Sequence, residues 1–189
     1  YDAESFHGVS MKEVGLRILI SAFARAAGRF DKGIMPLISY TTDHYFRSYV
    51  QVYDNVGCAN DTVSKVKTIK SGEKIGIKKI KKDVGPVWTG KLQDKKIFKD
   101  IRSIVGTKKL DSKVNILKLV DLLEEEAGMP MFYFTTDSIA SILKISPPKK
   151  LDLISNLEKN GYKASSTHFD PMGFKTDVKF DVIKKMFKH

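Results

Sequence analysis

The chain has 189 residues, 42% of them hydrophobic and 29% charged, with a formal net charge of +11. This composition is typical of one folded domain or two small ones and excludes wholesale disorder. The single cysteine, Cys58, excludes an internal disulfide and a cysteine-based zinc site, and it fits a reducing cytoplasm. No apolar run approaches the roughly 18 residues of a membrane span, and no signal peptide is visible. Because the chain opens with Tyr1 instead of methionine, we expect a piece of a longer protein.

The excess of positive charge predicts a polyanionic partner. Nucleic acid is the first candidate and an anionic membrane surface the second. A basic protein without such a partner is the remaining alternative.

Residues 10–30 are predicted to form a helix, because apolar residues recur in them at helical spacing. Ser10 and Glu13 have the spacing of a capping box, in which each side chain serves the other's backbone N–H. The segment 31–33 ends in glycine, which predicts the end of the helix there.

Two strands are expected next, at 34–40 and 44–53. In the second strand Tyr45, Arg47, Tyr49, Gln51 and Tyr53 share one face. This face can stack on RNA or hydrogen-bond to it. We favour the alternative in which the face packs under a neighbouring helix and its tyrosine hydroxyls are hydrogen-bonded there. Because an isolated hairpin is marginal in water, it needs a sheet to join. Otherwise its exposed edge would pair with another copy or with residues 76–82.

Residues 54–84 predict an exposed hairpin or loop, since glycines interrupt a run of eight lysines against one acid between Lys65 and Lys82. Such a run is either a solvated face or a set of phosphate contacts, which would give affinity without sequence preference. Trp88 can stack a base, but a lone tryptophan between Val87 and Leu92 is more often a packing anchor.

Helices are expected at about 93–105 and 111–127, and a short strand at 131–134. Two further helices follow, capped by Thr136 and Ser146, and the second would turn inward the apolar residues Leu151, Ile154 and Leu157. The segment 162–177 then predicts two strands joined by a type I turn at Asp170-Pro-Met-Gly173. With a closing helix at 179–188, this is a winged-helix-like arrangement, a shape often used on nucleic acid.

Little points to catalysis in the chain itself. Ser166, His168 and Asp170 alternate on one strand face, but no strained turn exposes the serine, so we expect no hydrolytic triad. His168 is expected to brace the wing or to touch a phosphate. The four histidines are scattered and no glycine-rich phosphate loop is present, so neither a metal nor a nucleotide loop is predicted.

Four segments, in order, give the chain a specific resemblance. They are Glu13-Val-Gly-Leu-Arg-Ile-Leu19, Asp43-His-Tyr-Phe-Arg47, Gly85-Pro-Val-Trp-Thr-Gly90 and Thr167-His-Phe-Asp-Pro-Met-Gly-Phe-Lys-Thr176. In these segments the chain resembles the tRNA guanine-26 N2,N2-dimethyltransferase family. The resemblance implies a two-part enzyme, with a Rossmann-like domain that binds S-adenosylmethionine and a C-terminal domain that helps to hold tRNA.

On that plan the fold is α+β. Residues 1–53 are the last helix and strand pair of the methyltransferase sheet, 54–108 a basic connecting segment with a strand at Trp88, and 109–189 a winged-helix-like tRNA-binding part. The family's cofactor loop and its Asp-Pro-Phe-Gly catalytic motif would lie upstream in the missing half. No residue of this chain is therefore expected to bind the donor, and the turn at Asp170 is not expected to be catalytic.

The residues expected to contact tRNA share a positive charge, or an imidazole in one case. They are Arg47, Lys78, Lys79, Lys81, Lys82, Lys149, Lys150, His168 and Lys175. Two other functions stay open, a stand-alone winged-helix DNA-binding regulator and a module whose partner is a protein.

Overall fold

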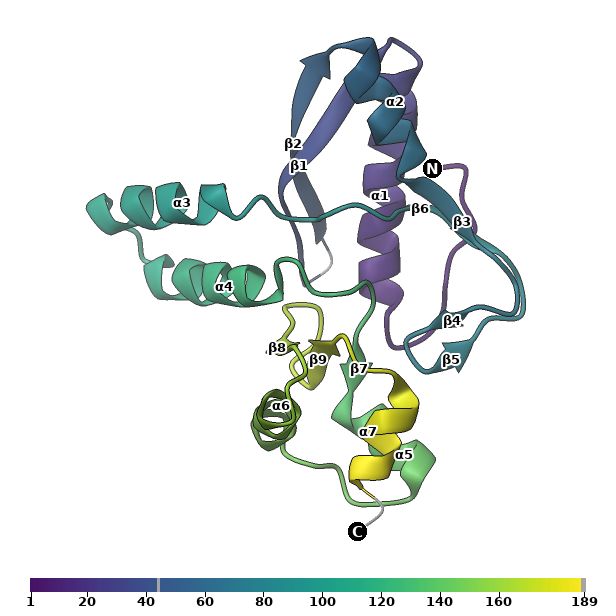
Figure 1. Ribbon diagram of the computed structural model, residues 1–189. Coiled ribbons are helices and arrows are strands. Elements are labelled where there is room, and N and C mark those ends of the chain that lie inside the picture. Colours follow the sequence, from purple (N-terminus) through teal and green to yellow (C-terminus); the bar gives the residue numbers. More distant parts are fainter. Residues whose placement is uncertain (44, 188–189) are drawn as a thin grey trace.

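The computed structural model describes residues 1–43 and 45–187 and shows a mixed α+β chain, as expected (Figure 1). His44, where the second strand was expected to begin, lies outside the described residues. So do His189 and Lys188, where the closing helix was expected to end. In the described part of the chain, no helix is both long enough and apolar enough to cross a membrane.

Helix α1 (Met11–Gly28) is the long central helix in Figure 1, and its Leu16 and Ile20 are fully buried. The predicted capping box is wrong. Ser10 makes no side-chain cap and instead donates its hydroxyl to the carbonyl of Tyr133, at 3.2 Å. The carboxylate of Glu13 pairs with two buried cations, which are described below.

The hairpin of β1 (Lys32–Thr42) and β2 (Tyr45–Asp54) is antiparallel, with a bulge between Pro36 and Ile38. Gly33 lies inside β1, so it does not end the helix as predicted. The face of β2 that carries Arg47 and the tyrosines is exposed, and Tyr45 keeps 64% of its surface. The expectation that a helix covers this face is wrong for the described chain, in which α1 packs against the hairpin (Figure 1).

Helix α2 (Val56–Ser64) was not predicted. It begins at Asn55, whose side chain accepts the backbone N–H of Cys58 at 3.0 Å. Strand β3 (Val66–Ile69) then pairs with β6 (Val84–Trp88).

Between these two strands, β4 (Lys74–Ile75) and β5 (Lys78–Lys79) form the predicted exposed hairpin. The alternative in which residues 76–82 pair with the edge of the first hairpin is wrong, because β5 pairs with β4. Trp88 is only 2% exposed and donates its indole N–H to the carbonyl of Lys91 at 2.9 Å. Its predicted role as a packing anchor is confirmed.

Helices α3 (Lys96–Thr107) and α4 (Lys113–Glu126) project side by side from the body of the molecule (Figure 1). Val120 and Leu123 of the predicted apolar stripe are buried, whereas Val114 is 62% exposed near the start of α4.

The C-terminal unit contains β7 (Phe134–Thr135), α5 (Thr136–Leu143), α6 (Lys150–Lys159), β8 (Ala164–Ser166), β9 (Gly173–Thr176) and α7 (Phe180–Met186). Its three strands lie in the order β7-β9-β8 and are antiparallel. The predicted turn is confirmed, since Gly173 donates its N–H to the carbonyl of Asp170 at 2.9 Å.

The helix starts in this unit differ from the predictions. Thr135, not Thr136, caps α5 by accepting the N–H of Ser138 at 3.2 Å. Helix α6 begins at Lys150 instead of directly after Ser146. Of the three residues expected to face inward, Leu157 is buried and Ile154 packs against the same core, whereas Leu151 is 68% exposed. Leu153, which was not predicted, is also buried there.

Candidate nucleic-acid interface

Four exposed lysines, Lys78 and Lys79 in β5 and Lys81 and Lys82 directly after it, are called the basic ridge here. Lys78 donates to the carbonyl of His7 at 2.8 Å, and its ammonium lies 5.5 Å from the Phe6 ring centroid. Lys82 forms an ion pair with Glu4 at 2.9 Å. The N-terminal segment therefore contacts the ammonium groups of two of the four ridge lysines.

Three further predicted residues also lie at the surface. Lys149 is the exposed N-cap of α6, and Lys150 is half-buried in its first turn. Arg47 is exposed on β2, where interaction with Tyr40, and with Tyr49, raises the pKa of its guanidinium above the ordinary value. Positive charge at a helix N-terminus opposes the helix dipole, so an anion bound beside Lys149 and Lys150 would relieve this repulsion.

His168 and Lys175 do not lie at the surface, and we withdraw both as tRNA contacts. The His168 side chain is 1% exposed, its Nδ1 pairs with a Glu126 carboxylate oxygen, and its Nε2 accepts the N–H of Thr41 at 3.2 Å. Of the two roles expected for His168, bracing of the wing is the one that the structure supports. Lys175 is 2% exposed and binds Glu13 at 2.9 Å.

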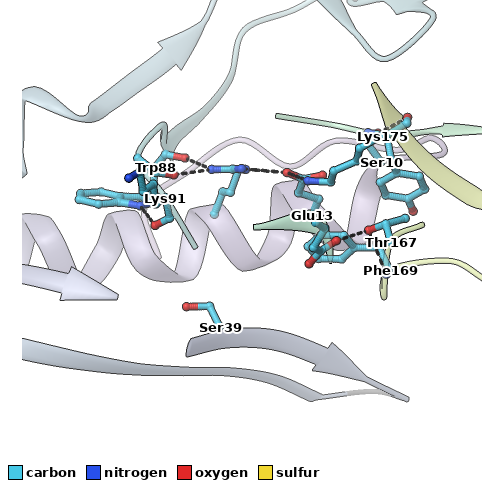
Figure 2. A network of polar contacts seen from close by, with 12 residues as sticks. Ser10, Glu13, Ser39, Trp88, Lys91, Thr167, Phe169 and Lys175 are labelled. Atoms are coloured by element: carbon cyan, nitrogen blue, oxygen red, sulfur yellow. Dashed lines mark hydrogen bonds and ion pairs between the residues drawn. The ribbon is translucent and has the colours of Figure 1, made fainter. Parts of the chain in front are cut away.

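Glu13, Arg17 and Lys175 form a buried ion triad (Figure 2). Arg17 binds the same carboxylate oxygen of Glu13 as Lys175, with Nε at 3.0 Å. Arg17 also donates to the carbonyls of Trp88, at 2.9 Å, and Gly90, at 3.1 Å. The triad therefore ties α1 to β9 and to the loop that follows β6.

The charge state of Glu13 follows from its surroundings. Burial by itself raises the pKa of the carboxyl, but the ammonium of Lys175 and the guanidinium of Arg17 outweigh this effect. The pKa ends below its ordinary value, so the carboxylate is ionised at neutral pH.

Sequence reasoning missed Arg17 and Glu126 and gave Glu13 the wrong role. A signal for Glu13 and Arg17 was present, since opposite charges four residues apart within an apolar helix lie on the same face. Glu126 gave no comparable signal, because it ends an acidic helix turn and its partners, Thr167 and His168, lie about 40 residues away.

The arrangement offers little for bond-breaking chemistry. Ser166 is buried, and both ring nitrogens of His168 are engaged, Nδ1 by Glu126 and Nε2 by the N–H of Thr41, so neither is left to activate the serine and the triad considered from the sequence is not assembled. Residues 1–43 and 45–187 also hold no group of three side chains placed to ligate a metal. What the chain presents is buried ion pairs that join its parts and exposed cations that suit phosphate.

Comparison with known proteins shows what this arrangement belongs to. The family described as N2,N2-dimethylguanosine tRNA methyltransferase matches residues 1–188. The chain is 34% identical over 196 residues to tRNA (guanine(26)-N(2))-dimethyltransferase of Pyrococcus horikoshii, covering all of this chain and 51% of that protein. It is 30% identical to the enzyme of the same name from Methanobrevibacter smithii, covering 100% of this chain and 53% of that protein.

A solved structure, of Trm1 from Pyrococcus horikoshii in complex with S-adenosyl-L-methionine, superposes with a TM-score of 0.86 at 32% identity. It covers 98% of this chain and 52% of the other. The chain thus spans about half the length of the relatives it matches. On sequence and on structure, it belongs to the N2,N2-dimethylguanosine tRNA methyltransferase family.

Proposed function

We propose that this chain is the tRNA-holding C-terminal portion of an S-adenosylmethionine-dependent tRNA (guanine-26-N2) dimethyltransferase that acts in the cytoplasm. The observation that carries the proposal is the match of the whole chain to about half of such enzymes. A net charge of +11 on this half agrees with a role in holding a polyanion. The relatives described above give no support to a DNA-binding regulator.

Two hollows among residues 1–43 and 45–187 suit the methyl donor poorly. S-Adenosylmethionine carries a positive sulfonium, which an uncompensated carboxylate would suit. The cavity beside Arg17 and Lys175 measures about 160 Å³, below the roughly 300–1,000 Å³ of small-molecule sites. A larger groove of about 880 Å³ carries four lysines, and one of its two acids, Asp61, already pairs with Lys65. We therefore place the donor and the catalytic groups in another part of the enzyme.

Element order supports a winged-helix-like assignment for the C-terminal unit. Helices α5 and α6 lie in sequence between β7 and β8, and β9 returns between these two strands. Lys149 and Lys150 lie at the start of α6, the second helix, where such folds often meet a nucleic-acid backbone. We propose that this helix start and the basic ridge both face tRNA.

Binding measurements test the function as a whole. At matched salt the 189-residue chain should bind folded tRNA more tightly than duplex DNA, and it should transfer no methyl group unaided. Tighter binding to duplex DNA would favour the regulator instead. Absence of binding to either nucleic acid at moderate salt would favour a protein partner.

Alanine at all four ridge lysines is expected to flatten the salt dependence of tRNA binding. Each phosphate that is no longer neutralised should reduce the slope of log K against log salt by about 0.7 to 0.9. Titrations over a range of salt concentrations measure this slope. The control replaces four exposed lysines of the α3–α4 hairpin with alanine, which changes the net charge equally. They are Lys99, Lys108, Lys109 and Lys118. Equal slopes for the two variants would remove the ridge from the interface.

A further inference from the structure

A groove of about 880 Å³ lies where β1, α2 and the segment from Trp88 to Lys96 meet. Ile34 and Trp88, both nearly fully buried, contribute to its apolar floor. Four lysines line it, Lys65, Lys91, Lys95 and Lys96, and none of them is among the nine residues that the sequence named as tRNA contacts. A volume of this size accommodates a nucleotide-sized ligand, by the general range of about 300–1,000 Å³.

The charge of the groove is positive and only partly compensated. Asp61 pairs with Lys65, and Asp94 accepts the backbone N–H of Lys96 at 3.1 Å. Lys91, Lys95 and Lys96 are exposed, and none of the ion pairs in the described chain engages them. Three like charges within six residues repel one another, and an anion in the groove would remove that cost.

The segment that carries these lysines is firmly attached to its neighbours. The side-chain amide of Gln93 bonds both backbone groups of Ser39, accepting its N–H at 3.0 Å and donating to its carbonyl at 2.7 Å. Asp94 donates its N–H to the carbonyl of Leu37 at 2.9 Å. The indole N–H of Trp88 donates to the carbonyl of Lys91, and Figure 2 shows the two residues side by side. Such a pre-ordered backbone lowers the entropic cost of binding.

We propose that this groove binds the sugar–phosphate backbone of RNA, with Lys91, Lys95 and Lys96 on the phosphates. The inference rests on the proposed function and adds a contact surface to it. Tyr53, which is 38% exposed, and Met35 line the groove with apolar surface against which a base can pack. An anionic membrane is a poorer match, because a flat bilayer does not enter a groove.

The first test removes the charge without touching the floor. K91A/K95A/K96A should weaken tRNA binding and reduce the salt slope by about 0.7 to 0.9 for each phosphate that these lysines neutralise in the wild type. The matched control, K108A/K109A/K118A, should leave the slope near that of the wild type. An unchanged slope in the groove variant, with wild-type tRNA binding intact, overturns this inference and leaves the proposed function standing. Failure of the wild-type chain to bind tRNA contradicts the proposed function itself.

The second test uses Cys58, the single cysteine of the chain, which is half-buried and lines the groove. Saturating tRNA should slow the alkylation of Cys58 by neutral N-ethylmaleimide several-fold in the wild type and in the control variant. Guanosine monophosphate at the same nucleotide concentration should leave the rate unchanged. Alkylation that tRNA does not slow, or that the free nucleotide slows equally, overturns the assignment to an RNA backbone. Circular dichroism confirms that each variant is folded.

Discussion

Replacing Glu13 with glutamine is expected to lower the free energy of unfolding by about 3 to 5 kcal/mol, the usual cost of breaking a buried ion pair from one side. Glu13 has no exposed surface, and the two cations that share its carboxylate are nearly as buried. Glutamine keeps the shape of the side chain, so the loss measures charge and not volume.

The charge balance of the triad predicts which of two substitutions lowers the stability more. The triad holds one negative and two positive groups. E13Q leaves the cations of Arg17 and Lys175 facing each other without an anion, whereas K175M leaves the neutral pair of Glu13 and Arg17. E13Q should therefore cost more stability than K175M. Urea unfolding curves with equal m-values measure both changes, and a K175M variant that is as unstable as E13Q would contradict this prediction.

The same carboxylate predicts a pH dependence. Because the folded protein lowers the pKa of Glu13 below its ordinary 4.5, its stabilising contribution is complete above that pH. The contribution is lost as the pH falls through the lower folded value, since the unfolded chain takes up the proton first. The stability gap between wild type and E13Q should accordingly narrow below pH 4.5. A gap that stays constant on acidification would show that Glu13 does not carry this effect.

The parts of the fold that sequence predicted well depend on local patterns. Helices α3 and α4 follow from the spacing of apolar residues, and the β8–β9 hairpin follows from the turn chemistry of Asp170 and Gly173. Trp88 was placed in the core because a bulky indole between apolar neighbours buries more surface than any other residue. In each case the residues that decide the structure are close together in sequence.

The errors came from partners far apart in the chain. Lys175 was expected at the surface because its positive charge suits a tRNA contact, but β9 is the central strand and all four of its residues are buried. Its partner Glu13 is 162 positions away, and no spacing rule connects them. His168 was misplaced for the same reason, since Glu126 and Thr41 reach it from other elements.

The candidate interface was therefore predicted in part. Arg47 and the six lysines outside β9 lie at the surface or half-buried, where phosphate can reach them. The groove was missed because its lysines come from two segments that only the fold brings together, Lys65 after α2 and the others after β6. Each lysine alone is an ordinary surface residue.

Alanine at position 33 is the second substitution with a large expected effect. The added Cβ of G33A would lie 2.6 Å from the carbonyl carbon and oxygen of Cys58, which are backbone atoms of α2. Helix α2 cannot easily withdraw, because the hydroxyl of Thr62 accepts the N–H of Ile34 at 2.9 Å and donates to its carbonyl at 3.3 Å. Overpacking of this kind costs about 1–3 kcal/mol, and contact with backbone places G33A toward the upper end.

The matched control is alanine at Gly106, in helix α3, where a Cβ meets nothing within 4 Å. There alanine should raise stability by up to about 1 kcal/mol, because glycine is the poorer helix former. Urea unfolding compares the two variants, and alkylation of Cys58 reports whether α2 has moved away from β1. We expect faster alkylation in G33A only. If both variants unfold at the wild-type urea concentration, the close approach of α2 to β1 does not restrict position 33.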